Sequence, residues 1–333
     1  MARRRWRTPA VEMTLSIESL SNDSRGVAHH EGKAVFVEGA LPGEVVRCET
    51  TKRTSKFDTA KVLEVLQASS DRVQPKCSAA GVCGGCSLQH MSESSQIYAK
   101  QQVLLENLQQ LGKLKPQSVL TPLQGPHWHY RRKARLGVKV VPKKGGVLVG
   151  FREKQSGLLA VMEQCEVLDE RFSHLITPLR ELIGKMAIAK RIPQIEVAAG
   201  DDAAVLVFRH LEPISESDQA LLKDFAQQHN LSIMLQPAGP NSIQALYPAM
   251  QELLEYRLDE WDVSISFRPT DFTQVNAIIN KLMIARAVEL LAPEENDEGL
   301  DLFCGIGNFT LPLARVSKQG SGLDGVTVLV NMA

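Results

Sequence analysis

An apolar strand pattern that runs directly into a glycine turn, LDLFCGIGNFT at residues 300–310, restricts the possible folds of this chain more than any other stretch. Gly305 and Gly307 permit a tight turn, a helix pattern begins in the following NFTLPLARV, and SGLDG at 321–325 predicts a second short strand. Strand, glycine turn, helix and strand in this order indicate the start of a βαβ unit with parallel strands. Two strands are fewer than a doubly wound sheet needs, so we expect this domain to be incomplete.

A glycine turn of this kind suits a ligand that contains a nucleoside. The glycines let the backbone approach the ligand closely, and the start of the helix offers unpaired N–H groups. Asp324 stands at the end of the second strand, where an acidic side chain commonly binds ribose hydroxyls. The third glycine of the dinucleotide motif is missing, which disfavours a nicotinamide oxidoreductase, and a tight turn without any ligand remains the alternative.

The charge balance of the chain gives no global electrostatic argument for a nucleic-acid partner. It has 38 Lys and Arg against 38 Asp and Glu, a formal net charge of zero, so an interface with RNA must depend on local patches. The basic N-terminus is not followed by an apolar segment, and the sequence contains no uninterrupted apolar stretch of about 18 residues. We therefore expect a cytoplasmic protein without membrane contact.

One loop holds three of the six cysteines, with the spacing C-x5-C-x2-C: Cys77, Cys83 and Cys86. In a reducing compartment, clustered cysteines bind metal or do chemistry more often than they form disulfides. For a fourth ligand we choose Cys165, at a strand-to-helix junction, over Cys48 in a strand pattern and Cys304 in the glycine turn. A division into three cysteines plus one remote cysteine favours an iron–sulfur cluster, with structural zinc or unligated thiols as the alternatives.

The N-terminal part of the chain reads as a small all-β domain. Apolar and polar residues alternate in short runs over residues 12–67, and turn signals separate the runs, which is typical of a barrel of the OB type. Four basic residues fall on the last hairpin: Lys52, Arg53, Lys56 and Lys61. They indicate either a solvated rim or a nucleic-acid-binding surface.

The middle of the chain mixes strand and helix patterns. After the cysteine loop, residues 94–114 predict a helix with Gly112 as its C-cap. Further helices are expected at 167–186, 217–229 and 274–292. Strands are expected at 134–141, 147–152, 194–199, 204–210, 231–237, 242–248 and 262–269. This region therefore predicts an α+β domain, followed by the α/β segment that contains the glycine turn.

Three motifs together identify a family. FTQVN at 272–276, LDLFCGIGNFTLPLA at 300–314 and the cysteine loop give the chain a resemblance to the RNA uracil-5-methyltransferases, within them to those that act on 23S rRNA. The resemblance covers essentially the whole chain. It implies a TRAM domain of OB-like fold at 1–70, a central α+β domain with a 4Fe–4S cluster at 71–258, and an incomplete Rossmann-like methyltransferase domain at 259–333. The resemblance implies that the protein is a monomer and that it converts one uridine of 23S rRNA to 5-methyluridine.

The resemblance also assigns site residues. The implied cluster ligands are Cys77, Cys83, Cys86 and Cys165. The implied contacts to S-adenosylmethionine are Gln274, Phe303, Asn308 and Asp324. Gln274 starts a helix and can hydrogen-bond the methionine part, and Phe303 and Asn308 flank the glycine turn. Asp324 can accept hydrogen bonds from both ribose hydroxyls.

A basic stretch, HWHYRRKARL at 127–136, also matches the central domain of the family. Tyr130 can stack on a base, and four cations can meet phosphates: Arg131, Arg132, Lys133 and Arg135. A charged edge strand is the alternative interpretation. The stretch GFREKQSG at 150–157 is similar but weaker.

The sequence departs from the family in its catalytic residues. Carbon 5 of uracil accepts a methyl group only after a cysteine thiolate adds to carbon 6, and a base must then remove the carbon-5 proton. The family carries that cysteine in an S-C-N-P motif well after the cofactor-binding acid, and the 333 residues contain no such motif. Cys304 precedes the glycine turn and is no substitute. We therefore expect a C-terminally truncated enzyme that is inactive by itself, with a non-catalytic RNA-binding iron–sulfur protein as the alternative.

Overall fold

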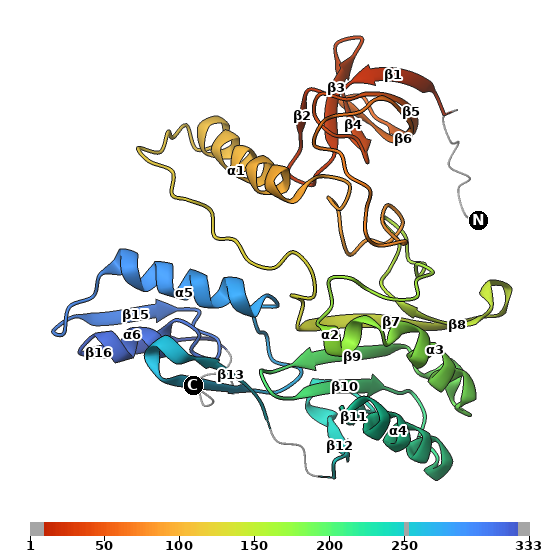
Figure 1. The fold of residues 1–333 in the computed structure, drawn as a ribbon, viewed down its shortest axis with the longest axis vertical. Coiled ribbons are helices and arrows are strands. Elements are labelled where there is room, and N and C mark those ends of the chain that lie inside the picture. Colours follow the sequence, from red (N-terminus) through yellow and green to blue (C-terminus); the bar gives the residue numbers. More distant parts are fainter. Residues whose placement is uncertain (1–9, 250–252, 326–333) are drawn as a thin grey trace. The chain divides into compact units, whose positions relative to one another are not determined.

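The computed structural model describes residues 10–249 and 253–325 (Figure 1). The chain forms two compact units, Met1–Pro122 and Leu123–Ala333. The predicted division into three domains, with boundaries after residues 70 and 258, stays a prediction. Among the described residues, no helix has the length and apolar character needed to cross a membrane.

The first unit is built on one six-stranded sheet. Its strands are β1 (Glu12–Ser16), β2 (Ser19–Leu20), β3 (Gly26–His30), β4 (Lys33–Glu38), β5 (Val45–Arg53) and β6 (Phe57–Gln67). They pair in the order β1-β5-β6-β4-β3-β2, and only β4 and β6 are parallel. The alternation seen in the sequence puts Val35, Val37 and Val46 into a shared core with Leu15 and Ala60. The all-β prediction is confirmed, although β3 was not among the expected strands.

The helix after the cysteine loop, α1 (Glu93–Gln110), is present, but its predicted cap is wrong. The helix ends at Gln110 with Leu111 as its C-cap, and the residue with left-handed backbone is Lys113, with φ of +53°, not Gly112. None of the α1 residues is buried, and Leu104 and Leu111 are 58% and 79% exposed. Apolar periodicity therefore predicted the helix but not the burial of one of its faces.

The second unit contains the central sheet. Its strands are β7 (Lys133–Val141), β8 (Gly146–Gly150), β9 (Gln194–Ala199), β10 (Ala204–Arg209), β11 (Ser232–Gln236) and β12 (Gln244–Tyr247). Their order is β12-β11-β10-β9-β7-β8, and only β10 and β11 are parallel. All six match predicted strands. Helices α3 (Ile176–Lys185) and α4 (Glu216–His229) pack next to this sheet, while the start of the predicted helix 167–186 forms a separate short helix, α2 (Glu170–Ser173).

The remainder of the second unit forms the surroundings of the glycine turn. It contains β13 (Leu254–Leu258), β14 (Val263–Phe267), α5 (Ala277–Leu291), β15 (Glu298–Leu302), α6 (Thr310–Val316) and β16 (Gln319–Leu323). Strands β15 and β16 are parallel neighbours, as the turn predicted. The prediction that Gln274 starts a helix is wrong: α5 begins at Ala277, and the Asn276 side chain caps it by accepting the N–H of Ile279 at 3.1 Å.

The antiparallel hairpin β13–β14 ties the glycine turn to the central sheet. Its buried side chains, among them Tyr256, Ile265 and Phe267, share one apolar core with Val205 and Val207 of β10 and with residues of α5 and the glycine turn. Strand β13 was not expected from the sequence. Part of the segment after residue 258, including β14 and the buried side of α5, therefore belongs to the core of the second unit.

Strands β15 and β16 differ from that hairpin in burial. Leu300, Leu302 and Leu323 are 65%, 56% and 63% exposed. A two-stranded parallel sheet buries little apolar surface, so β15 and β16 contribute less to the core than β13 and β14 do.

Candidate cofactor site

The glycine turn joins the end of β15 to the start of α6. The N–H groups of Phe303 and Cys304 donate to the carbonyl of Leu323 at 2.7 and 3.2 Å, which holds the turn against the end of β16. Gly305 and Gly307 have φ of +58° and +84°, in the region where only glycine is free of strain. A Cβ built on Gly305 would meet nothing within 4 Å, so the space in front of the turn is open. A ligand can therefore approach this backbone closely.

Asp324 lies against the turn, as predicted. It directly follows β16, and its Oδ2 accepts a hydrogen bond from the N–H of Gly305 at 3.0 Å. The parallel pairing of Leu302 with Leu323 puts the carboxyl ends of both strands at one edge, where ligands bind in open α/β sheets. The carboxylate and the glycine backbone thus form one polar site.

Close packing behind the turn accounts for two further residues. The hydroxyl of Thr310 donates to Oδ2 of Asp301 at 2.6 Å and fastens α6 to β15. A Cβ on Gly322 would lie 2.8 Å from Sγ of Cys304, so a glycine is needed there for close approach. Burial, reinforced by the charges of Asp301 and Asp324, raises the pKa of the Cys304 thiol, and a thiol with a raised pKa is a poor nucleophile.

Asn308 is held by two residues that the sequence analysis missed. Its Oδ1 accepts hydrogen bonds from the hydroxyl of Tyr256 at 2.8 Å and from Nδ2 of Asn280 at 2.9 Å, and its own Nδ2 donates to Oδ1 of Asn280 at 2.9 Å. Burial raises the pKa of Tyr256, so its hydroxyl keeps its proton. The signal that could have revealed Asn280 is its place within the apolar helix AIINKLMIARAVELL.

The other two predicted cofactor residues have exposed side chains. Phe303 is 88% exposed and has φ of +67°, which is unusual for a residue with a side chain. Gln274 lies in the loop before α5, and the carbonyl of its neighbour Val275 accepts the N–H of Arg132 at 2.9 Å. Three of the four predicted contacts, those of Phe303, Asn308 and Asp324, therefore belong to the glycine turn or touch it.

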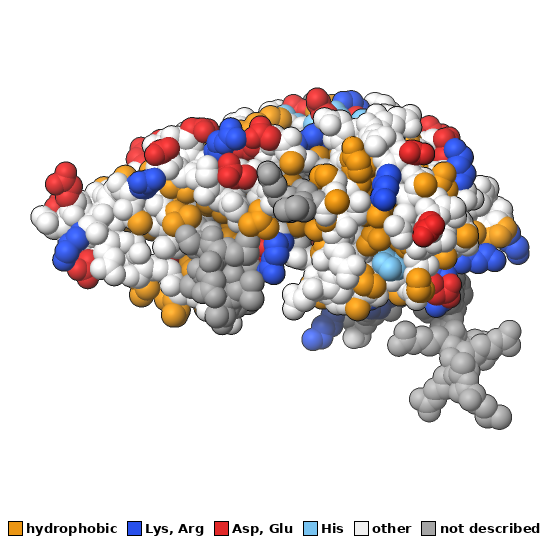
Figure 2. All heavy atoms as spheres, turned by 90° about the horizontal axis from the view of Figure 1, so that it is seen from below, with side chains coloured by type: hydrophobic (Ala, Val, Ile, Leu, Met, Phe, Trp, Pro, Cys, Tyr) orange, Lys and Arg blue, Asp and Glu red, His pale blue; other side chains and the backbone are white. Residues whose placement is uncertain are grey.

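Most of the cations expected to meet phosphates are engaged within the second unit. Arg132 pairs with Asp201 at 2.5 Å, Arg135 with Glu196 at 2.7 Å, and the ammonium of Lys133 donates to the carbonyl of Asp271. Within the described residues, Arg131 is the one of these four cations whose side chain forms no hydrogen bond or ion pair. On the face drawn in Figure 2, basic and acidic side chains are interspersed, in keeping with a chain of zero net charge.

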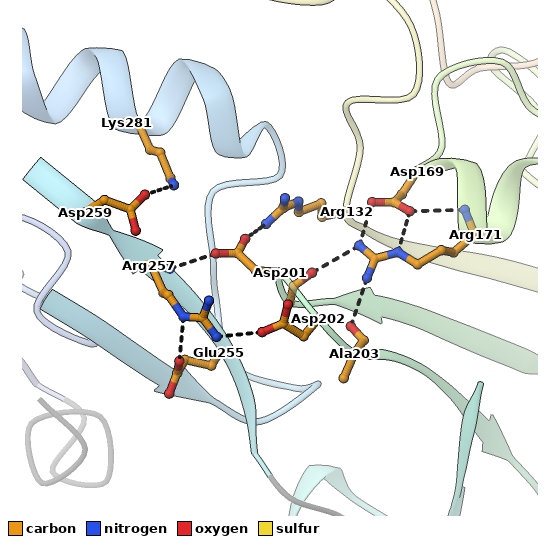
Figure 3. A network of polar contacts seen from close by, with 11 residues as sticks. Arg132, Asp169, Arg171, Asp201, Asp202, Ala203, Glu255, Arg257, Asp259 and Lys281 are labelled. Atoms are coloured by element: carbon orange, nitrogen blue, oxygen red, sulfur yellow. Dashed lines mark hydrogen bonds and ion pairs between the residues drawn. The ribbon is translucent and has the colours of Figure 1, made fainter. Parts of the chain in front are cut away.

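Arg132 and Asp201 belong to a larger polar network (Figure 3). Oδ2 of Asp201 also accepts the backbone N–H of Arg257 at 2.9 Å, and Arg257 pairs with Asp202 at 2.6 Å. Arg171 donates to the carbonyl of Gly200 at 3.0 Å, next to Asp201 in the chain. The network thus joins β7, β13 and the loop between β9 and β10, and it braces the hairpin under the glycine turn.

The pKa of Asp201 gives this network a pH dependence. Burial alone would raise that pKa, but the hydrogen bonds from Arg132 and from the Arg257 N–H outweigh it, and the pKa is lowered. A carboxyl whose folded-state pKa is depressed stabilises the fold above its unfolded pKa, about 3.9, and that contribution is lost as the pH falls through the lower folded-state value.

Asp201→Asn is expected to lower the free energy of unfolding at pH 7 by about 1.5–3 kcal/mol, because a partly buried charge-assisted hydrogen bond between Asp201 and Arg132 is lost. The loss of stability between pH 5 and pH 2 should be shallower in this variant than in the wild type. Urea unfolding at several pH values measures both effects. Asp202→Asn is the matched control: its side chain is 76% exposed and paired at the surface, so about 0.5 kcal/mol or less is expected. Equal effects of the two substitutions would contradict this prediction.

The cysteine loop lies in the first unit and has the local features of a thiolate site. Gly81 has φ of +83° and turns the backbone, and the N–H of Gly85 donates to Sγ of Cys83 at 3.3 Å. Cys83 is 8% exposed, and Cys77 and Cys86 are half-buried. Amide donors to sulfur are typical of cysteines that bind iron–sulfur clusters. The donor set and this hydrogen bond fit a cluster.

The fourth predicted ligand, Cys165, belongs to the second unit. It is 6% exposed, and its N–H donates to the carbonyl of Ser173 at 2.9 Å. All six cysteines are free of disulfides, as expected for clustered thiols with another role. Within residues 10–249 and 253–325, no group of three or more potential metal-ligating side chains is gathered around one point. The cluster and its four ligands therefore stay a prediction.

Comparison with known sequences establishes the class of this protein. The tRNA (uracil-5-)-methyltransferase family profile matches residues 92–320, and the TRAM domain profile matches residues 8–63. The chain belongs to the tRNA (uracil-5-)-methyltransferase family and carries an N-terminal TRAM domain. The family resemblance inferred from the three motifs is confirmed.

Individual relatives narrow the similarity further. The 23S rRNA (uracil(1939)-C(5))-methyltransferase RlmD of Bordetella avium is 48% identical over 323 residues, which are 97% of this chain and 68% of the relative. The protein of the same name from Nitrosospira multiformis is 49% identical over 317 residues, 95% of this chain and 72% of the relative. About three tenths of each relative thus lie outside the alignment with these 333 residues.

A solved structure supports the fold. The crystal structure of Pyrococcus abyssi tRNA (uracil-54, C5)-methyltransferase in complex with S-adenosyl-L-homocysteine matches 96% of this chain and 75% of that chain, with a TM-score of 0.68. At 20% sequence identity, this likeness shows that the two chains share a fold.

Proposed function

We propose that this chain binds S-adenosylmethionine and 23S rRNA for the methylation of one uridine at carbon 5. The observation that carries the proposal is the contact between Oδ2 of Asp324 and the N–H of Gly305 at the end of two parallel strands. It places an acceptor for ribose hydroxyls beside an open glycine backbone, as a bound nucleoside requires. The names of the most similar relatives supply the expected RNA.

Four residues take the expected roles toward S-adenosylmethionine. Asp324 accepts from the ribose hydroxyls, and the exposed ring of Phe303 offers a flat apolar surface beside the turn. Asn308 can still donate one amide hydrogen, and Gln274 offers an amide to the methionine part. The bound cofactor supplies a methyl group made electrophilic by its sulfonium. The residues of this chain bind and orient that cofactor.

The chemistry at uracil needs groups that these 333 residues do not provide. A thiolate must add to carbon 6, and a base must take the proton from carbon 5. Cys304 is buried with a raised thiol pKa and is sealed behind the turn, so it does not serve as that thiolate. We infer that the 333-residue polypeptide binds the cofactor without transferring its methyl group. The alternative function is that of an RNA-binding iron–sulfur protein without catalysis. It is based on the same observation, that these 333 residues contain no S-C-N-P motif.

Binding of RNA is assigned to the TRAM domain and to the start of β7. In the first unit, Lys52 and Lys56 are exposed at the tip of the β5–β6 hairpin, where cations can meet phosphates, and Arg53 beside them is exposed but pairs with Asp58 at 3.6 Å. In the second unit, Arg131 is the best placed of the predicted cations because the others are paired. An enzyme for ribosomal RNA acts in the cytoplasm, and a monomer remains the expected state.

Cluster binding is assigned to the four cysteines named in the sequence analysis. A cluster with four protein thiolates has no open iron, so its role is structural or serves to position RNA. The three cysteines of the loop would hold three irons, and Cys165 the fourth.

Titration with S-adenosylhomocysteine tests the proposed function. Isothermal titration calorimetry of the 333-residue polypeptide is expected to show one binding site per chain. The same preparation, given methyl-labelled S-adenosylmethionine and unmodified 23S rRNA, is expected to transfer no label above a blank without protein. Absence of binding would overturn the cofactor proposal, and incorporation of label would overturn the inferred inactivity.

A further inference from the structure

A small polar cluster lies inside the apolar core under the glycine turn. Tyr256 on β13 is 9% exposed and belongs to this core, and Asn280 on α5 is 5% exposed and lies one helical turn from Ile284 of the same core. Buried polar groups are costly unless they are hydrogen-bonded. Within the described part of the chain, all the hydrogen bonds that these two side chains form with a third side chain go to Asn308 of the glycine turn.

The bonding pattern sets the amide of Asn308 relative to that of Asn280. Oδ1 of Asn308 accepts from two donors, the hydroxyl of Tyr256 and Nδ2 of Asn280, while one hydrogen of its Nδ2 goes to Oδ1 of Asn280. Rotating the Asn308 amide alone by 180° would bring its NH2 group against the NH2 group of Asn280 and its oxygen against Oδ1 of Asn280. In the orientation that the structure has, one amide hydrogen of Asn308 is left over, so this side chain can offer a ligand a donor.

We propose that Asn280 and Tyr256 are positioning residues for the cofactor site, which present the free N–H of Asn308 to an acceptor atom of S-adenosylmethionine. The inference rests on the proposed function, because Asn308 is a cofactor contact only if the cofactor binds at this turn. The three side chains come from β13, α5 and the turn, so the cluster also couples the turn to the hairpin β13–β14. No contact between Asn280 or Tyr256 and the cofactor is required.

Tyr256→Phe and Asn280→Ala are the direct tests, with the dissociation constant of S-adenosylhomocysteine as the readout. Tyr256→Phe removes one hydroxyl and should weaken binding about threefold to tenfold, the loss of one neutral hydrogen bond. Asn280→Ala removes both amide bonds and should weaken it tenfold or more. Ile284→Val is the control, since Ile284 lies one turn further along α5, is fully buried, and has no polar side-chain atom that could hold Asn308. It is expected to lower the melting temperature but to change the dissociation constant less than twofold.

A double-mutant cycle separates positioning from a general loss of packing. If Asn280 acts through Asn308, then Asn280→Ala should have little further effect on binding in a chain that already carries Asn308→Ala. Additive effects, or wild-type affinity in both Asn280→Ala and Tyr256→Phe, would overturn the inference while leaving the proposed function intact. A wild-type chain that binds no S-adenosylhomocysteine would instead refute the proposed function, and the inference with it. Tyr256→Phe is nearly isosteric, so the test stands even if the alanine variant folds poorly.

Discussion

Cys83→Ser is expected to remove the proposed iron–sulfur cluster completely, whereas Cys304→Ser should leave it unchanged. A serine oxygen is a poor ligand for iron compared with a thiolate. The variant would keep three of the four thiolate ligands, and we expect a cluster held in this way to be lost during purification. Cys304 lies behind the glycine turn and should not bind iron. The measurement is the iron and acid-labile sulfide content of anaerobically purified protein, together with its visible absorbance. Zinc in place of iron in the wild type would contradict the assignment and favour the structural-zinc alternative.

The same experiment decides the identity of the fourth ligand. Cys165→Ser should behave like Cys83→Ser, although the two cysteines are 82 residues apart in the chain. Cys48 provides a second control: burial raises the pKa of its thiol to about 11, and its Sγ points to the carbonyl of Met13 within the barrel core at 3.6 Å. If Cys165→Ser keeps the full cluster and Cys48→Ser loses it, the selection of Cys165 from its place at a strand-to-helix junction is wrong.

The strands formed by continuous apolar runs in the middle of the chain could be predicted from the sequence. The central strands β9 and β10 are continuous apolar runs between turn signals, and both were placed to within one residue. Strand β13, LEYRL, has only five residues and includes two charges, and its burial depends on the partner strand β14 and on the sheet beneath. Local sequence contains no record of such a partner, so the strand was missed.

The partners of the basic residues at the start of β7 could not be predicted from the sequence either. Arg132, Lys133 and Arg135 look like a phosphate-binding strip because their neighbours in sequence are basic. Their actual partners, Asp201, Asp271 and Glu196, lie between 61 and 138 residues away in the chain and reach them only through the fold. Charge that is paired in the native state is not available for RNA, and pairing of this kind cannot be read from a window of ten residues.

The glycine turn was predictable because it requires a specific backbone. Positive φ at Gly305 and Gly307 is a local property, and an acid after the next strand has a fixed place in a parallel pair. The support of Asn308 by Asn280 and Tyr256 was not predictable in this way, because it links residues 28 and 52 positions apart. Residues that face a ligand can therefore be predicted from the sequence more readily than the residues that hold their side chains in position.

Asp324→Ala is expected to weaken binding of S-adenosylhomocysteine at least a hundredfold. The substitution removes the carboxylate proposed to accept two charge-assisted hydrogen bonds from the ribose, each contributing about 1.5–3 kcal/mol, and leaves the N–H of Gly305 without the acceptor it has now. Asp324→Asn keeps an oxygen for Gly305 but loses the charge, so an intermediate effect is expected. Calorimetric titration of both variants, with thermal unfolding as a check on folding, gives the comparison.

Glu298→Gln is the matched control for that experiment. Glu298 begins β15 and pairs with Lys318 at the surface, at the end of the parallel strand pair that is opposite to Asp324. The substitution Glu298→Gln therefore removes one negative charge, as Asp324→Ala does, but at a distance from the glycine turn. The dissociation constant of S-adenosylhomocysteine for Glu298→Gln should stay within a factor of two of the wild-type value. If Asp324→Ala also binds with wild-type affinity, Asp324 is only a cap for the glycine turn, and the ribose must be held elsewhere. If both carboxylate variants weaken binding equally, the effect is one of net charge at this sheet, and the contact at 3.0 Å between Asp324 and Gly305 does not mark the cofactor site.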